Sequence, residues 1–188
     1  ERYVPTQHRG IAYSDEALVI ASDEAGRPLR AMTRPAILGR LLQLAQIKDD
    51  DVVLLVGAGL GYTAAILGEL ASSVIALECD DTLANAAQDN LEAGGVDNAV
   101  VVTGTLEEGY AKEAPYDQIF VDGAAQIAPA ALEEQLKVGG RMVAVHGKGL
   151  AGRARLTTRG EHGFASRDAF NASLDTLPGF VPAPTFVF

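Results

Sequence analysis

The sequence predicts an α/β protein with a doubly wound, mostly parallel sheet. Three observations point to this fold class. Short apolar runs rich in Val, Leu and Ile alternate with stretches of helical periodicity. Hydrophobic residues make up 48% of the 188 residues, which is enough for a packed core, whereas aromatic residues make up only 6%. Strands and helices that alternate along a chain form βαβ units, which place successive strands in a parallel sheet.

The first part of the chain is predicted to be an arm followed by a helix. Pro and Gly interrupt residues 1–32, in which short strands such as 17–21 are expected. Thr33 is expected to cap the helix, and Pro35 suits its first turn, where the missing N–H has no partner to lose. Apolar residues then recur at helical spacing as far as Ala45.

The central part of the chain shows the clearest alternation of strand and helix patterns. Its predicted strands are continuous apolar runs, as expected for parallel strands that are buried on both faces. These strands cover 52–56, 74–78, 99–103, 118–122 and 141–146. The expected helices cover 62–70, 80–91 and 129–136, with a turn at Gly139 and Gly140. After Gly147 the pattern weakens, with a strand expected at 154–158 and an edge strand at 179–188.

The charge and hydropathy of the chain exclude several classes of partner. The formal net charge is −10, and basic residues gather only within 27–34 and 153–159. Proteins that bind nucleic acids present a basic face to the phosphates, so we expect no nucleic-acid partner. No apolar run is long enough to span a bilayer and no signal peptide opens the chain, so we expect a cytoplasmic protein without membrane contact. Because the sequence begins with Glu1 and not Met, we expect an N-terminal segment to be missing.

The sequence gives little support for metal chemistry. Cys79 is the only cysteine, so neither an internal disulfide nor a cluster of thiolate ligands is expected. His8, His146 and His162 lie far apart and have no neighbouring ligand pattern. We therefore expect no metal site and ordinary hydrogen-bonded or solvated histidines.

A glycine-rich turn follows the first central strand, in the run VVLLVGAGLGY. Gly57 and Gly59 permit a tight turn from strand to helix and a close approach of the backbone to a ligand. The next helix offers free N–H groups to an anion, which is a pyrophosphate in a dinucleotide site and a methionine carboxylate in an S-adenosylmethionine site. Gly61 gives the G-x-G-x-G spacing typical of methyltransferases.

Two further residues narrow the class of ligand. Tyr62 stands where the dinucleotide fingerprint has its third glycine, which makes a nicotinamide dehydrogenase the least favoured enzyme. Glu78 ends a predicted strand about twenty residues after the turn, where a carboxylate can accept hydrogen bonds from ribose hydroxyls. The turn and Glu78 together predict a nucleoside-type ligand.

More specific patterns lie outside the glycine turn. Residues 109–147, GYAKEAPYDQIFVDGAAQIAPAALEEQLKVGGRMVAVHG, contain an A-P-[FY]-D element, an alanine-rich turn and the run P-x-x-L-x-x-Q-L-K-x-G-G-R. RYVP at 2–5 and AYSD at 12–15 correspond to F-V-P and A-Y-x-D elements. In these features the chain resembles the protein-L-isoaspartate O-methyltransferase family. A helical segment usual at the start of that family is absent from the printed sequence.

The resemblance implies a Rossmann-like methyltransferase fold that uses S-adenosylmethionine as cofactor. The implied activity is methyl transfer to the carboxylate of an isoaspartyl residue in a damaged protein or peptide. We expect one domain over 1–188, with an arm and substrate loop (1–32), a cofactor-binding core (33–147) and C-terminal strands (148–188). Thr33 takes the place of the family's substrate-loop serine and is the implied catalytic residue. The implied cofactor-binding residues are Gly57, Ala58, Gly59, Gly61, Glu78, Cys79, Thr105, Leu106 and Asp122.

Four positions depart from the family's pattern. Two positions before the first glycine, the family has an acidic residue that helps to hold the cofactor's amino group. Leu55 stands at this position here. Thr105 replaces the aspartate of a G-D-G element near the adenine, although Leu106 can still pack on the ring. Thr33 keeps the hydroxyl group of serine but adds a methyl group. Asp122 replaces a small or hydroxyl residue at the end of a strand.

These departures leave two other functions open. A non-catalytic or divergent paralogue that binds the cofactor weakly is favoured by Leu55 and Thr105. A methyltransferase with another acceptor is favoured by Asp122 and by the arginines that replace a glycine- and glutamine-rich loop. Among these, Arg30 and Arg34 are expected to be solvated, with contact to a substrate carboxylate as the alternative. The sequence gives no indication of the oligomeric state.

Overall fold

The computed structural model describes residues 1–182, which form a seven-stranded sheet, a two-stranded sheet and four α-helices. The strands of the large sheet are β3 (Val52–Val56), β4 (Ser73–Glu78), β5 (Ala99–Thr103), β6 (Tyr116–Ala125), β7 (Leu136–His146), β8 (Arg153–Gly160) and β9 (Gly163–Asn171). The small sheet is a hairpin of β1 (Val19–Ser22) and β2 (Pro28–Ala31). The α-helices are α1 (Pro35–Ala45), α2 (Tyr62–Leu70), α3 (Asp81–Gly94) and α4 (Ala130–Glu133), and the 3-10 helices are η1 (Thr6–Ile11), η2 (Leu106–Glu108), η3 (Ala111–Glu113) and η4 (Gly149–Ala151).

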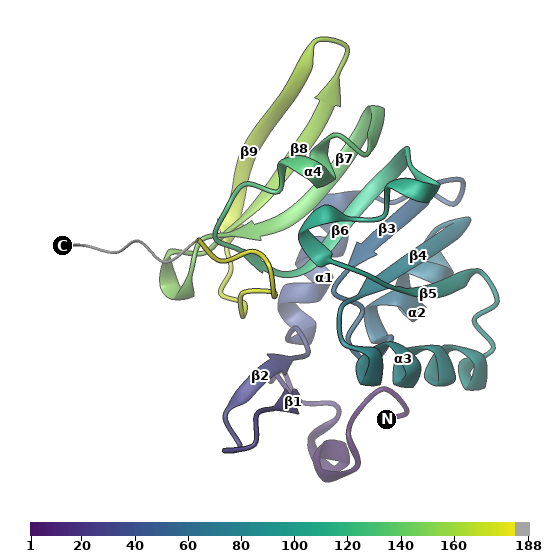
Figure 1. Ribbon diagram of the computed structural model, residues 1–188, viewed down its shortest axis with the longest axis vertical. Helices are drawn as coiled ribbons and strands as arrows, with labels where there is room; N and C mark the ends of the chain where they lie inside the picture. Colours follow the sequence, from purple (N-terminus) through teal and green to yellow (C-terminus); the bar gives the residue numbers. More distant parts are fainter. Residues whose placement is uncertain (183–188) are drawn as a thin grey trace.

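The large sheet has the strand order β5-β4-β3-β6-β7-β8-β9, as Figure 1 shows. The strands from β5 to β7 in this order are parallel, and β8 and β9 extend the sheet in antiparallel fashion. The chain passes from β3 outward to β5 and then returns to β6 on the other side of β3. The predicted doubly wound, mostly parallel fold is therefore confirmed. Ligands of such sheets bind outside the carboxyl ends of the strands where the order reverses, here between β3 and β6.

Both faces of the sheet are buried, but by different kinds of structure. In Figure 1, α1 and α2 lie behind the sheet and α4 lies in front of it. The core behind the sheet includes the fully buried residues Leu41, Leu55, Leu67, Leu91 and Phe120. The core in front is closed by α4, η2 and the segment that follows β9, through Leu106, Leu132, Leu177 and Phe180. Burial on both faces explains the continuous apolar runs of β3 and β4.

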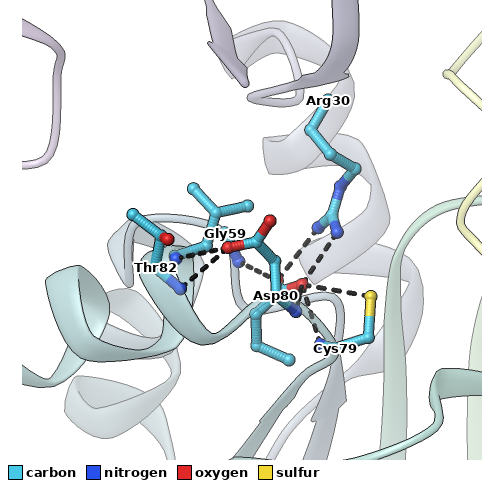
Figure 2. Close-up of polar contacts among 7 residues, drawn as sticks. Arg30, Gly59, Cys79, Asp80 and Thr82 are labelled. Carbon is cyan, nitrogen blue, oxygen red and sulfur yellow. Dashed lines mark hydrogen bonds and ion pairs between the residues drawn. The ribbon is translucent and has the colours of Figure 1, made fainter. Parts of the chain in front are cut away.

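Several central elements have the predicted bounds. The predicted ranges 52–56, 62–70 and 99–103 are those of β3, α2 and β5. The bounds of β4 and α3 differ from the prediction by one to three residues. Asp80 caps α3, because its carboxylate accepts hydrogen bonds from the backbone N–H groups of Thr82 and Leu83 (Figure 2).

The connection between β6 and β7 differs from the prediction. The helix predicted over 129–136 is only the short α4, because Leu136 already pairs with Tyr116 in the sheet. Gly139 and Gly140 lie inside β7, where the pairing register with β6 shifts, and do not end a helix. A Cβ atom on Gly140 would lie 2.8 Å from the carbonyl oxygen of Lys137, so glycine is needed at this irregularity.

The end of the chain was predicted only in part. The strand expected at 154–158 is confirmed within β8. β9 was not predicted, because nearly all its side chains are exposed and no apolar alternation marks it. Of the edge strand expected at 179–188, residues 179–182 are not in a strand, and 183–188 lie outside the described residues.

The start of α1 corrects the prediction for Thr33. The N-cap residue is Arg34, and its side chain makes no capping hydrogen bond. Asp15, from the arm, accepts a 2.8 Å hydrogen bond from the backbone N–H of Ala36 instead. The arm therefore supplies the cap that Thr33 was expected to provide. No helix within residues 1–182 has the length and apolarity needed to cross a membrane.

Candidate functional site

The glycine turn lies between β3 and α2, at the point where the strand order reverses. Gly57, Gly59 and Gly61 all have positive φ, at 89°, 56° and 87°. A Cβ atom on Gly61 would lie 3.1 Å from the carbonyl oxygen of Ala87 in α3, so the turn and α3 require glycine there. Within the described chain no side chain caps α2. Its first N–H groups are therefore available to an anion.

Glu78, the last residue of β4, is fully buried beside this turn. Oε2 of its carboxylate accepts a 2.8 Å hydrogen bond from the backbone N–H of Gly59. Oε1 accepts hydrogen bonds from the backbone N–H groups of Cys79 at 2.9 Å and Asp80 at 3.3 Å. Figure 2 draws the hydrogen bonds from Gly59 and Cys79 as dashed lines. The backbone of the turn and of the β4 end thus fixes the orientation of Glu78.

Arg30 of β2 contacts the same carboxylate. Its Nη1 and Nη2 atoms donate hydrogen bonds to Oε1 and Oε2 of Glu78, at 2.9 and 3.1 Å (Figure 2). Arg30 is only 7% exposed, so the expectation that it is solvated is wrong, whereas Arg34 is exposed as expected. Both oxygens predicted to meet a ribose therefore already have a bidentate partner in this structure.

Asp122 of β6 is hydrogen-bonded to α2 and to the segment that precedes α1. Its carboxylate accepts hydrogen bonds from the hydroxyl groups of Thr33, at 2.6 Å, and Thr63, at 2.5 Å. Pairing of β6 with β3 ends at Val121, so Asp122 lies at the carboxyl end of that pairing although β6 itself continues. Desolvation raises the pKa of the Asp122 carboxyl above its ordinary value, and the two hydroxyl donors and the charge of Arg30 offset only part of this rise.

An open groove of about 340 Å³ lies beyond Glu78 and is lined by Cys79, Thr105, Leu106 and Gly179, among others. Leu106 is 1% exposed and contributes to the core in front of the sheet. Burial and the neighbouring Glu78 carboxylate raise the pKa of the Cys79 thiol, so this cysteine is protonated at neutral pH. The groove suits a flat, mostly apolar group.

Leu55 is a core residue of the sheet. It is fully buried in the core behind the sheet, together with Leu38, Leu41 and Phe120. The position that is acidic in the resembled family is therefore a packing position in this chain.

Two smaller cavities meet at the segment from Arg30 to Thr33. The glycine-turn cavity, about 20 Å³, is lined by Gly57, Gly59, Thr63 and this segment. The outer cavity, about 90 Å³, is lined by the same segment together with Arg34, Asp122 and residues 173–177. Pockets for small ligands usually measure about 300–1,000 Å³. The hairpin that carries Arg30 therefore closes the glycine turn in this structure.

Most of the residues predicted for the site lie together at the carboxyl ends of β3, β4, β5 and β6. The predicted residues Gly57, Ala58, Gly59, Thr33 and Asp122 all line the glycine-turn cavity, and Cys79, Thr105 and Leu106 line the groove. The sequence did not identify Thr63, whose only signal is its place in the first turn of α2. It also did not pair Arg30 with Glu78, because 48 residues separate them. Among residues 1–182, no group of three or more His, Cys, Asp or Glu side chains is placed to hold a metal ion.

The strand order, the glycine turn after β3 and the acidic end of β4 define a Rossmann-like methyltransferase domain. A solved structure of a protein-L-isoaspartate O-methyltransferase superposes with a TM-score of 0.84 at 23% identity, over 95% of this chain and 58% of that one. A beta-aspartate methyltransferase (PCMT) from Plasmodium falciparum, in complex with S-adenosyl-L-homocysteine, gives a TM-score of 0.75 at 18% identity, over 94% of this chain and 84% of that one. At these identities the likeness shows the fold.

The chain belongs to the protein-L-isoaspartate(D-aspartate) O-methyltransferase (PCMT) family, whose profile matches residues 1–168. The protein-L-isoaspartate O-methyltransferase of Koribacter versatilis (strain Ellin345) is 42% identical over 144 residues, which are 76% of this chain and 62% of that protein. The one from Petrotoga mobilis (strain DSM 10674 / SJ95) is 36% identical over 162 residues, which are 86% of this chain and 73% of that protein. This chain spans about three fifths of the length of most such relatives. The predicted family is confirmed.

Proposed function

We propose that this chain binds S-adenosylmethionine at the glycine turn and transfers its methyl group to the carboxylate of isoaspartyl residues. The observation that carries the proposal is Glu78, a buried carboxylate that backbone N–H groups orient at the ligand-binding end of a methyltransferase-like sheet. Membership of the family and the relative solved with S-adenosyl-L-homocysteine support the same assignment. The acceptor partner is then a protein or peptide with isoaspartyl residues, and no nucleic acid is involved.

The residues present fit this cofactor in most of its parts. Gly57, Ala58, Gly59 and Gly61 with the start of α2 would receive its carboxylate, and Glu78 would receive the ribose hydroxyls. Cys79, Thr105 and Leu106 would line the adenine in the groove. Asp122 would lie near the methionine part, because it borders the glycine-turn cavity. Leu55 offers no counter-ion to the amino group, so we expect weaker affinity than an acid there would give.

The proposed reaction asks little of the protein in acid–base chemistry. An isoaspartyl carboxylate is ionised at neutral pH, so no base is needed to make it a nucleophile. S-adenosylmethionine supplies a methyl group on a positively charged sulfur. The contribution of the chain is to align the carboxylate oxygen with that methyl group and to exclude water. Thr33 is proposed to contact the acceptor in the outer cavity, and residues 1–188 are proposed to act as one domain.

The test combines binding and activity. Calorimetric titration of the folded protein with S-adenosyl-L-homocysteine should give a Kd in the micromolar range, roughly −8 kcal/mol. Transfer of a labelled methyl group should be detected on an isoaspartyl peptide and not on the same peptide with ordinary aspartate. A folded protein that neither binds S-adenosyl-L-homocysteine nor methylates the isoaspartyl peptide would contradict the proposal.

A second candidate is methyl transfer to another acceptor. Asp122 places a carboxylate at the border of the outer cavity, where it would repel an isoaspartyl carboxylate unless a cation lies between them. Binding of S-adenosyl-L-homocysteine together with methylation of some other acceptor, but not of the isoaspartyl peptide, would favour this candidate.

A further inference from the structure

The bidentate pair between Arg30 and Glu78 uses the carboxylate that is proposed to bind the ribose. The guanidinium and the carboxylate form two parallel hydrogen bonds, at 2.9 and 3.1 Å, with side chains only 9% and 0% exposed. Such paired geometry is the strongest way in which arginine binds a carboxylate. Because Glu78 is fully buried and both of its oxygens are paired with Arg30, a ribose hydroxyl would have to compete with this guanidinium for them.

Glu78 does not depend on Arg30 for its orientation. Three backbone N–H groups, from Gly59, Cys79 and Asp80, already donate to its two oxygens. In contrast, within residues 1–182 the Arg30 side chain donates hydrogen bonds only to Glu78. The carboxylate is therefore prepared to accept another ligand, and the guanidinium is the partner that can be exchanged.

A second carboxylate, that of Asp122, lies close to Arg30. Arg30 and Asp122 both line the glycine-turn cavity and the outer cavity, and the charge of Arg30 already acts on the Asp122 carboxyl group. An arginine released from Glu78 would find Asp122 as its next acidic neighbour at the border of the outer cavity. There it would also supply the cation that an acceptor carboxylate needs beside Asp122.

We propose that Arg30 determines acceptor specificity by exchanging partners: it pairs with Glu78 in the cofactor-free protein, and binds the acceptor carboxylate beside Asp122 once the cofactor takes Glu78. This inference rests on the proposed function, because it assumes a ribose at Glu78 and a carboxylate acceptor. It makes the cofactor the first ligand to bind. The acceptor site forms only after Arg30 has been displaced.

The test measures S-adenosyl-L-homocysteine binding by calorimetry for the wild type, Arg30→Gln, Arg30→Lys and Arg34→Gln. Arg34 is the matched control, because it is an arginine on the same cavity but exposed and without a bond to Glu78. Removal of the competing guanidinium should lower the Kd of Arg30→Gln about tenfold, or about 1.4 kcal/mol. Arg30→Lys cannot form the bidentate pair, so its Kd should lie between those of the wild type and Arg30→Gln. The Kd of Arg34→Gln should equal that of the wild type.

The second readout is the coupling between the two ligands. Saturating S-adenosyl-L-homocysteine should tighten isoaspartyl-peptide binding to the wild type about tenfold, and this gain should disappear in Arg30→Gln. In turnover, Arg30→Gln should raise KM for the peptide with little change in kcat. A purely structural ion pair would lower the Tm of Arg30→Gln but would give neither the tighter cofactor binding nor the loss of coupling.

The outcomes separate the two proposals. If the wild type binds S-adenosyl-L-homocysteine and both Arg30 variants bind it with the same Kd, the partner exchange is wrong while the proposed function stands. If no variant binds it although thermal melting shows all of them folded, the proposed function fails. If Arg30→Gln does not fold, unchanged affinity and coupling in Arg30→Lys would be enough to reject the exchange.

Discussion

Thr33 donates its hydroxyl hydrogen to Asp122 in a 2.6 Å hydrogen bond that ties the end of the hairpin segment to β6. Thr33 is the residue proposed to contact the acceptor, and Asp122 is a departure from the family's pattern. Because its one hydrogen is used by Asp122, the Thr33 hydroxyl can only accept a hydrogen bond from a further partner. Direct donation from Thr33 to an acceptor carboxylate therefore requires this bond to break.

The raised pKa of Asp122 makes stability depend on pH. Because the folded-state pKa lies above the unfolded value of about 3.9, the folded protein binds more protons than the unfolded chain between these two values. Stability from this group is therefore lost as pH rises through that interval. Asp122→Asn removes this dependence, so its Tm relative to the wild type should increase from about pH 4 to pH 7. Thermal melts at a series of pH values measure this.

Asp117 provides a control of opposite sign. Burial alone would raise its pKa, but hydrogen bonds from Lys137 and from the Val52 backbone prevail and lower it. Its contribution is present above the unfolded pKa and is lost as pH falls through the lower folded value. The Tm of Asp117→Asn relative to the wild type should therefore decrease as pH rises. If Tm relative to the wild type changed with pH in the same direction for both variants, the raised pKa of Asp122 would be contradicted.

Leu55→Glu should destabilise the protein, although it restores the family's acidic residue. Leu55 is 0% exposed to solvent and packs among apolar core residues, so the new carboxylate would be buried without a partner. We expect a loss of about 3 kcal/mol, which corresponds to roughly 6–12 °C in Tm for a chain of this size. Leu55→Met, which keeps volume and polarity, should cost less than about 1.5 kcal/mol. A Leu55→Glu variant as stable as the wild type would show that an unseen polar partner exists.

Gly61→Ala should weaken the packing between α2 and α3. Its φ of 87° is unfavourable for alanine, and the added Cβ would lie 3.1 Å from the Ala87 carbonyl oxygen. We expect a loss of about 1–3 kcal/mol in urea unfolding. Gly39→Ala is the control, since Gly39 lies in α1 with nothing within 4 Å of the new Cβ and should gain roughly 0.5–1 kcal/mol. Similar losses at both sites would refute the argument from backbone conformation.

Tyr116→Phe tests a hydrogen bond made by the tyrosine of the A-P-Y-D element. The Tyr116 hydroxyl donates to the Tyr110 carbonyl oxygen at 2.6 Å, and burial raises the pKa of this phenol above its usual range. Loss of the donor should cost about 1 kcal/mol, measured as the free energy of unfolding. Tyr13→Phe, at a side chain that is 86% exposed, should have no measurable effect.

Regular local patterns made much of the fold predictable. The run of residues 52–56 is apolar because both faces of β3 are covered, and the turn after it needs three glycines with positive φ. These signals are local, so the sequence alone identified β3, α2 and the ligand-binding end of the sheet. β9 carries no such signal, since its side chains are mostly exposed on both faces. Helical periodicity near 129–136 was misleading, because pairing with Tyr116 draws Leu136 into β7.

The candidate site was predictable in its residues but not in its contacts. Glycine spacing and the acidic end of β4 identified Gly57, Gly59 and Glu78. The partner of Glu78 could not be identified, because the sequence around Arg30 shows no regular pattern and its burial depends on how the hairpin folds back over the turn. The same holds for Thr33, which a local interpretation assigned to helix capping and the structure assigns to Asp122.

The closeness of Arg30 and Thr33 in the chain has an evolutionary consequence. Two residues separate them, yet one binds the carboxylate that ends β4 and the other binds the carboxylate in β6. Because Arg30 and Thr33 lie on one short segment, the effects of mutations at Glu78 and Asp122 are expected to be non-additive. Among relatives, Arg30, Thr33 and Asp122 are therefore expected to change together, whereas Glu78, which is held by backbone N–H groups and is proposed to bind the ribose, is expected to be kept.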